Sequence, residues 1–136
     1  MNECALGDRV KRQAFGRATL IHGEFCFRNV LVDLEGQGGQ ILGLIDFEKA
    51  RVADPLEDIG RMLLYSIYWQ REHTRAFIDA YGVPALPSWI DRLEFHLLGF
   101  GLEVASWAST VDPTHFSEVR QIVSDIVSRP GAWVSA

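Results

Sequence analysis

Between Leu20 and Asp58 the chain carries polar side chains whose types and spacing are suited to chemistry. The set consists of His22, Glu24, Arg28, Asn29, Asp46 and Asp58. A carboxylate can orient or deprotonate a hydroxyl group, and carboxylate and amide oxygens are ligands that Mg²⁺ accepts. Apolar runs surround these residues, so the pattern indicates ligand chemistry on a rigid platform.

Short strands and a hairpin must position this set. The sequence predicts a strand over 19–22, a buried strand over 29–34, a glycine-rich turn over 35–39 and a return strand over 40–46. Because the hairpin returns the chain to the end where it began, Asn29 and Asp46 are expected to lie close together.

Helices should follow the hairpin and a loop over 47–55. Asp54 and Pro55 are typical of a helix start, and Gly82 should end a second helix over 71–81. Ser88 is the expected cap of a third helix, and Asp112 with Pro113 repeats the start signal for a last one that ends at Pro130. The apolar stripes of these two helices are Leu93, Leu97, Phe100, Val104 and Trp107, then Phe116, Val119, Val123 and Ile126. The expected fold class is α+β, a β-hairpin and loop followed by a helical bundle.

Composition narrows the function classes. The 136 residues carry a net charge of −5 and are 48% hydrophobic, as expected for one globular domain without a basic stripe for nucleic acid. No secretory signal and no membrane-spanning stretch is visible, so the chain is expected to be cytoplasmic. Cys4 and Cys26 form no metal or disulfide motif. Cys26 lies in the polar cluster and is either a nucleophile or, as the residues favour, a small buried filler.

The stretch "HGE…RNVLVD…IDFEKA…DPLEDIG" resembles the aminoglycoside phosphotransferase and choline-kinase-like family, a branch of the protein-kinase-like fold. The family pattern is H-G-D-x-x-x-x-N followed by I-D-[WF], and the match is dense from Thr19 to Gly60. The polar, glycine-punctuated residues 1–18 are expected to form a partly ordered N-terminal arm, and the resemblance implies a C-terminal kinase-like lobe over 19–136. In that lobe 19–60 would hold the catalytic and metal-binding loops and 61–136 would be helical.

The resemblance also implies roles and cofactors. Glu24 stands where the family has its catalytic Asp, and Asn29 and Asp46 match its magnesium ligands, with ATP as phosphate donor. His22 and Asp58 match structural positions, and Asp58 would brace the catalytic loop through backbone hydrogen bonds. The residues themselves leave alternatives open: a salt bridge between Glu24 and Arg28, a cap at Asn29 and a turn at Asp46. Glu48, Lys49 and Arg51 are expected to be solvated. Helical spacing makes the core the default for the aromatic residues after position 88, and Trp89 and His96, which fall away from the main stripe, are the candidates for a substrate cleft.

Two departures from the family pattern determine the functional prediction. Glu24 has one methylene more than Asp, and no glycine-rich loop or phosphate-binding lysine precedes the motif. We therefore expect an ATP-dependent phosphotransferase for a small-molecule hydroxyl, truncated and inactive alone. The alternative is a non-catalytic binding or oligomerisation module, and a metal-dependent hydrolase is a third option that needs a further ligand. An apolar patch around Phe25, Phe27 and Phe47 predicts self-association or a partner that supplies the missing lobe.

Overall fold

A computed structural model describes residues 19–35, 39–67, 71–83 and 88–131 of the chain. The arm expected over 1–18 and the connection over 84–87 lie outside the described residues. Small antiparallel sheets come first and helices follow, so the fold is α+β, as predicted. No helix of the described ranges is long and apolar enough to cross a membrane.

Two separate pairs of strands frame the N-terminal half. Strand β1 (Thr19–Ile21) pairs with β4 (Arg51–Ala53), and β2 (Val30–Asp33) pairs with β3 (Gln40–Leu44) in an antiparallel hairpin. The prediction of a plain loop over 47–55 was wrong, since β4 lies within it. Its partner β1 is some 30 residues earlier, and a three-residue strand has too few side chains to show a period.

The helices begin at the predicted acidic caps. Asp54 accepts a hydrogen bond from the Leu56 amide (3.0 Å) and starts α2 (Pro55–Met62), which runs on into a π-helical segment, Leu63–Ile67. Helix α3 (Arg71–Tyr81) ends at Gly82, whose φ is 80°. Asp112 caps α5 (Pro113–Ser128) through the amides of Thr114 and His115.

The cap predicted at Ser88 was wrong. Ser88 precedes α4 (Trp89–Val111), but it adopts a left-handed conformation with φ of 49°, and its side chain makes no capping hydrogen bond. A serine oxygen reaches the first helical amides from an extended backbone, which Ser88 does not have.

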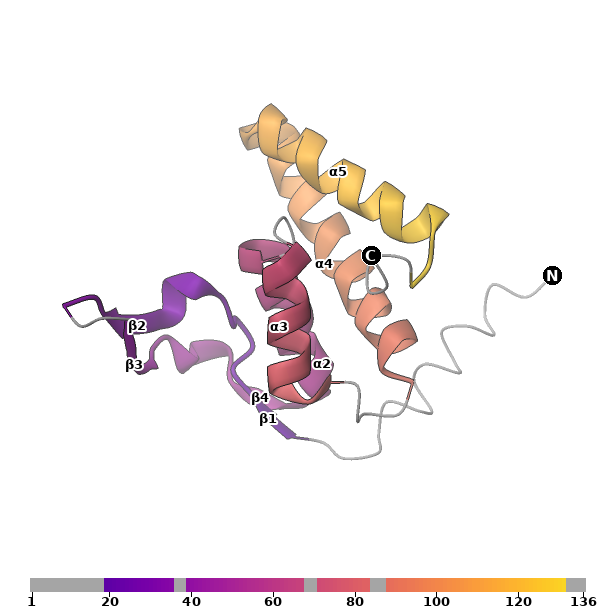
Figure 1. The fold of residues 1–136 in the computed structure, drawn as a ribbon. Coiled ribbons are helices and arrows are strands. Elements are labelled where there is room, and N and C mark those ends of the chain that lie inside the picture. Colours follow the sequence, from indigo (N-terminus) through magenta and orange to yellow (C-terminus); the bar gives the residue numbers. More distant parts are fainter. Residues whose placement is uncertain (1–18, 36–38, 68–70, 84–87, 132–136) are drawn as a thin grey trace.

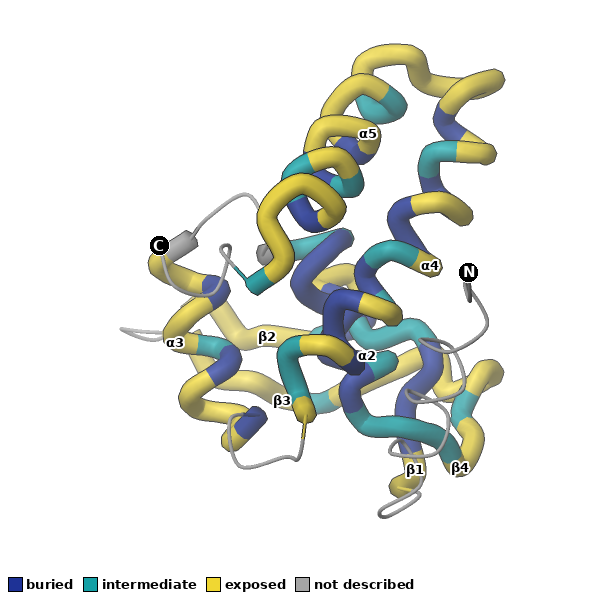
Figure 2. The backbone as a smooth tube through the Cα atoms, turned by 90° about the vertical axis from the view of Figure 1, so that its right-hand side faces the viewer, coloured by how far each residue is buried: buried dark blue, intermediate teal, exposed yellow. Residues whose placement is uncertain are grey.

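The core lies where α2, α4 and α5 meet (Figure 2). Leu56, Ile59, Leu93 and Leu97 are fully buried there. The stripe predicted for α4 continues to Ala108 rather than to Trp107, which is 55% exposed. At about 100° per residue, Trp107 and Ala108 lie equally far from the centre of the stripe on opposite sides, so the sequence pattern alone does not choose between them.

The hairpin is the main departure from the predicted burial. Strand β2 was expected to be buried, but its residues 31–33 are exposed, and so is most of β3. Figure 1 shows the hairpin projecting away from the helices. An apolar strand is buried only where another element packs on it, and the helices of the described residues pack on one another instead.

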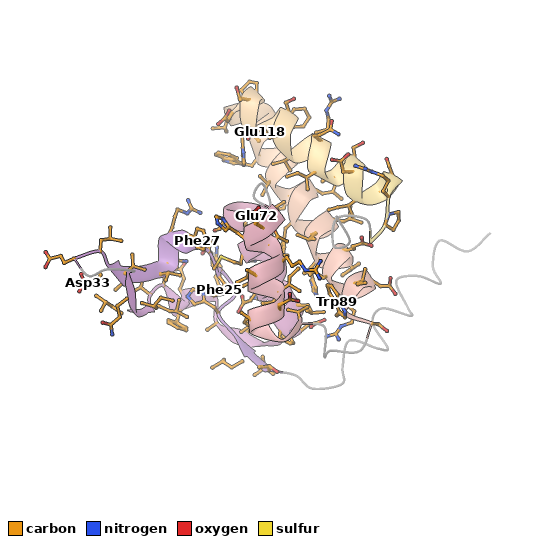
Figure 3. The ribbon with its side chains drawn as sticks, viewed as in Figure 1. Phe25, Phe27, Asp33, Glu72, Trp89 and Glu118 are labelled. Atoms are coloured by element: carbon orange, nitrogen blue, oxygen red, sulfur yellow. The ribbon has the colours of Figure 1, made fainter. Side chains whose placement is uncertain are left out.

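The predicted phenylalanine patch is only partly present. Phe25 is half-buried and packs against Phe77 of α3, with ring centroids 6.3 Å apart. Phe27 and Phe47 are 57% and 52% exposed. Figure 3 shows Phe25 and Phe27 near the base of the hairpin and Asp33 at its outer end. Self-association through this surface stays a prediction.

The burial pattern predicts how stability is distributed. Leu97→Ala should lower the free energy of unfolding by about 2–5 kcal/mol, because it leaves a cavity at a fully buried position. Ile41→Thr, at a side chain that is 69% exposed, should change it by less than about 0.5 kcal/mol. Denaturant unfolding of both variants measures this, and equal losses would contradict the exposed hairpin.

Candidate active site

The loop between β1 and β2 is held by the carboxylate of Asp58. The backbone amides of His22 and Gly23 donate to its two oxygens, at 2.6 and 2.8 Å. Asp58 is buried on α2, the helix that starts at Asp54. The backbone hydrogen bonds predicted for Asp58 are therefore present, and they join the loop to the helical core.

Glycine is required at position 23. Gly23 has φ of 83°, and a β-carbon there would come within 2.3 Å of the Lys49 carbonyl oxygen. The loop thus passes directly against the short 3₁₀ turn Phe47–Lys49, which follows β3. Only a residue without a side chain allows this approach.

His22 is buried between the loop and the hairpin. Its Nδ1 lies 3.3 Å from the Glu24 amide and its Nε2 lies 2.8 Å from the Ile45 carbonyl oxygen. Because an amide can only donate, Nδ1 must accept, so the neutral ring carries its proton on Nε2 and donates it to Ile45. The Phe47 ring packs beside it, at 4.4 Å between centroids. These contacts suit the structural role predicted for His22.

Asn29 and Asp46 lie at the same end of the hairpin. The Ile45 amide donates to the Asn29 carbonyl oxygen (3.0 Å), and Asp46 is the next residue. The Asn29 side-chain amide donates to the Glu24 carbonyl oxygen at 2.9 Å, which leaves its Oδ1 as an acceptor. Asp46 is exposed, and its backbone adopts a left-handed conformation with φ of 68°.

This donor set fits a cation that completes its shell with phosphate. Asn29 and Asp46 offer an amide and a carboxylate oxygen, and Mg²⁺ is commonly held by one or two carboxylates with phosphates and water. Across the described ranges there is no group of three or more His, Cys, Asp or Glu that could hold a metal. The hypothesis of a metal-dependent hydrolase needs at least one more His or carboxylate ligand beside this pair. Nothing in the described residues favours that hypothesis.

Glu24 pairs with a residue that was expected to be solvated. Lys49 Nζ lies 3.0 Å from Glu24 Oε2, whereas the salt bridge considered from the sequence was with Arg28. The close approach of Gly23 to Lys49 explains the change, because it brings the two side chains together. The hydrogen bond from Lys49 lowers the pKa of Glu24 below its usual 4.5, against the opposing effect of burial. Arg51 was also expected to be solvated and instead pairs with Glu57.

A cleft of about 740 Å³ opens beside Glu24. Its walls come from the loop, the π-helical segment, α4 and α5. They are formed by Glu24, Cys26, Phe27, Arg28, Leu64, Tyr65, Ser66, Glu103, Val104, Trp107, Asp112 and His115. Three carboxylates and three large aromatic side chains against one arginine make the cleft suitable for an organic cation.

The two residues singled out from the sequence as candidates for a cleft do not line this one. Trp89 packs against the core and His96 contacts Asp54, so neither lines it. Trp107, which was assigned to the core, lines it together with Glu103, one turn before it on α4. The signal available in the sequence was this spacing of four residues, which places Glu103 and Trp107 on the same face of α4. Cys26 is buried in the wall, as the filler reading expected.

Asp58 should be required for stability. Asp58→Ala leaves the amides of His22 and Gly23 without an acceptor, at about 1–3 kcal/mol each, so the free energy of unfolding should fall by about 3 kcal/mol. Denaturant titration measures this. Glu72→Ala, at an exposed position of α3, is the control and should change it by less than about 0.5 kcal/mol. A loss no larger than the control's would contradict the bracing role.

Lys49 should control the ionisation of Glu24. Removing its charge in Lys49→Met should raise the pKa of Glu24 toward 4.5, because the carboxylate loses its donor and its nearest cation. Carbon-detected NMR titration of the carboxyl group measures the shift. Arg129→Met, which removes a cation that pairs with Asp125 on α5, should leave the titration unchanged. A pKa unaffected by Lys49→Met would show that the ion pair does not form in solution.

Solved structures share this fold. Two structures of aminoglycoside 2'-phosphotransferase-IIIa, the GDP complexes of the wild-type enzyme and of a mutant, superpose with TM-scores of 0.52 and 0.55 at 20% and 21% identity. The superpositions cover 92% and 98% of this chain but 44% and 47% of those chains. The chain therefore spans less than half the length of these structural relatives.

Sequence comparison gives the family. The uncharacterized protein YcbJ of Bacillus subtilis (strain 168) is 37% identical over 60 residues, which are 44% of this chain and 18% of that protein. The model of the phosphotransferase enzyme family matches residues 5–96, more than half of the chain, and includes the loop, the hairpin and α2. On this match and the shared fold, the chain belongs to the phosphotransferase enzyme family.

Proposed function

We propose that the chain carries the phosphoryl-transfer site of a nucleotide-dependent phosphotransferase that acts on the hydroxyl group of a small organic cation. The observation that carries the proposal is the position of Glu24. Its side chain lines the acidic cleft, and its carbonyl oxygen accepts the hydrogen bond from Asn29. One loop residue thus joins the cleft to the pair Asn29 and Asp46.

In the proposed reaction the acceptor lies in the cleft with its hydroxyl group toward Glu24. The hydroxyl oxygen attacks the terminal phosphorus of the nucleoside triphosphate, and the bond from that phosphorus to the bridging oxygen breaks. Glu24 takes the hydroxyl proton, and the nucleoside diphosphate leaves. Its lowered pKa keeps Glu24 ionised, which a proton acceptor requires, although it also makes the carboxylate a weaker base.

Asn29 and Asp46 are the proposed magnesium ligands. Bound Mg²⁺ would neutralise charge on the transferring phosphates and align them with the attacking oxygen. The chain's own contribution is to hold the two ligands at the base of the hairpin, where the backbone bond between Asn29 and Ile45 keeps them beside the loop. Asp58 and His22 then fix Glu24 relative to that pair.

The acceptor class follows from the charge of the cleft. Glu103 and Asp112 stand across from the loop, and Trp107 and Tyr65 offer aromatic faces. An amino sugar or a quaternary amino alcohol combines the positive charge and the hydroxyl group that such a site requires. The structural relatives were solved with GDP, whereas the sequence resemblance implies ATP, so both nucleotides belong in the test.

Nucleotide binding should depend on Asp46. We expect Mg²⁺ alone to leave the melting temperature almost unchanged, because two protein ligands give affinity of about millimolar order. Mg²⁺ with ATP or GTP at about ten times the dissociation constant should raise it by roughly 3–6 °C. Asp46→Ala should remove that shift. The matched control is Asp33→Ala, at the outer end of the same hairpin (Figure 3), which should keep it. A shift unchanged in Asp46→Ala would overturn the metal assignment.

Transfer should depend on the Glu24 carboxylate. With γ-labelled nucleotide and an aminoglycoside or choline as acceptor, Glu24→Gln should lower any transfer by about 10²–10⁴-fold, because the proton acceptor is lost. Glu24→Asp keeps the carboxylate and should keep transfer. Both variants should bind nucleotide as the wild-type chain does, because Glu24 is not a proposed metal ligand.

The pairing of Glu24 with Lys49 favours a second candidate function. A carboxylate held by a lysine is a poorer proton acceptor, which suits a module that binds nucleotide or cation without transfer. The same assay separates the two: binding without transfer, in the wild-type chain and in Glu24→Asp alike, would support the binding module.

A further inference from the structure

A buried arginine on α4 binds the residue that caps the start of α2. Arg92 of α4 binds Asp54 with two nitrogens, Nη2 to Oδ1 at 2.5 Å and Nε to Oδ2 at 3.1 Å. The two side chains are only 7% and 9% exposed. His96, one turn further along α4, lies 3.4 Å from the same Oδ2. This bidentate geometry fixes the relative orientation of the Arg92 and Asp54 side chains as well as the distance between them.

The same carboxylate also caps α2. Asp54 Oδ1 accepts the Leu56 amide, so one side chain joins the first turn of α2 to the first turn of α4. Burial opposes ionisation of this carboxyl group, but the hydrogen bonds from His96, Arg92 and the Leu56 amide prevail and lower its pKa to about 2. The junction is therefore an ion pair at neutral pH.

From this junction, contacts run to the catalytic loop in one direction and to the cleft in the other. Asp58, one turn after Asp54 on α2, holds the amides of His22 and Gly23. In the other direction α4 continues without a break to Glu103 and Trp107 in the wall of the cleft. The 15 residues from Arg92 to Trp107 correspond to about 22 Å of rigid helix.

We propose that Arg92 is a positioning residue, which through Asp54 fixes the acceptor-binding half of α4 relative to the loop that carries Glu24. Neither Arg92 nor Asp54 lines the cleft, and their effect passes through α2 and Asp58. The part of this proposal that concerns the acceptor rests on the proposed function. The coupling of Arg92 to the loop does not.

Stability alone gives no reason for this arrangement. A buried ion pair contributes little net stability, because desolvation of the two charges offsets their attraction. A pair of leucines could pack α2 on α4 without setting the rotation of either helix. The bidentate contact does set it, and the rotation of α2 determines where the Asp58 carboxylate points.

Hydrogen exchange at the loop amides tests the coupling. Asp54→Ser keeps an oxygen that can cap α2 but loses the contact with Arg92. Arg92→Lys keeps the charge but loses the two-pronged geometry. By NMR, exchange of the His22 and Gly23 amides should accelerate at least tenfold in each variant, after correction for its measured global stability. The double variant should be no faster than the faster single variant, because both changes break one link.

Val119→Ala is the matched control for loss of stability. Val119 is a buried core residue of α5 whose apolar side chain takes no part in the ion pair or in the loop hydrogen bonds, so this variant should leave the corrected exchange of both amides unchanged. Exchange in Asp54→Ser and Arg92→Lys equal to that of the control would show that the pair is only structural and would overturn the proposal. Since no substrate is used, failure of the proposed function would leave this result standing.

Discussion

The two hydrogen bonds from the loop backbone to Asp58 are the interaction on which the rest of the site depends. They hold His22 and Gly23 against α2, and the next residue, Glu24, lines the cleft while it pairs with Lys49. His22 then binds the hairpin at Ile45, so the pair Asn29 and Asp46 is fixed to the same frame. A carboxylate with two bonded amides is a strong acceptor and a costly one to remove.

Helix α4 serves two purposes along its length. Its first half packs in the core and binds Asp54, and its second half turns Glu103 and Trp107 toward the cleft. The cleft therefore has one wall from the loop that holds Glu24 and another from a helix that is anchored near that loop's support. In the proposed function, this arrangement would keep an acceptor and the proposed proton-accepting group at a set separation, which positional catalysis requires.

The projecting hairpin has no covering layer among the described residues. Its apolar side chains are exposed on both faces, and two-stranded hairpins are marginally stable without a covering layer. The solved relatives of the same fold are more than twice as long as this chain. The site residues that the chain does contain lie at the base of the hairpin, where Asp58 and His22 support them directly.

Local signals in the sequence were enough to predict the α+β class, the hairpin, the caps at Asp54 and Asp112 and the helix end at Gly82, whereas the bracing hydrogen bonds of Asp58 were expected from the resemblance to the family. Turns, caps and apolar periods are decided by neighbouring residues, and the spacing of the motif marks the loop, so each can be read directly. The tertiary structure alone decided that Glu24 meets Lys49, that Arg92 meets Asp54 and that Trp107 leaves the core for the cleft. The partners in each pair are 25 or more residues apart. The close approach of Gly23 to Lys49 brings the first pair together, and the packing of α4 on α2 and α5 joins the second and turns Trp107 outward. None of these contacts has a local signal in the sequence.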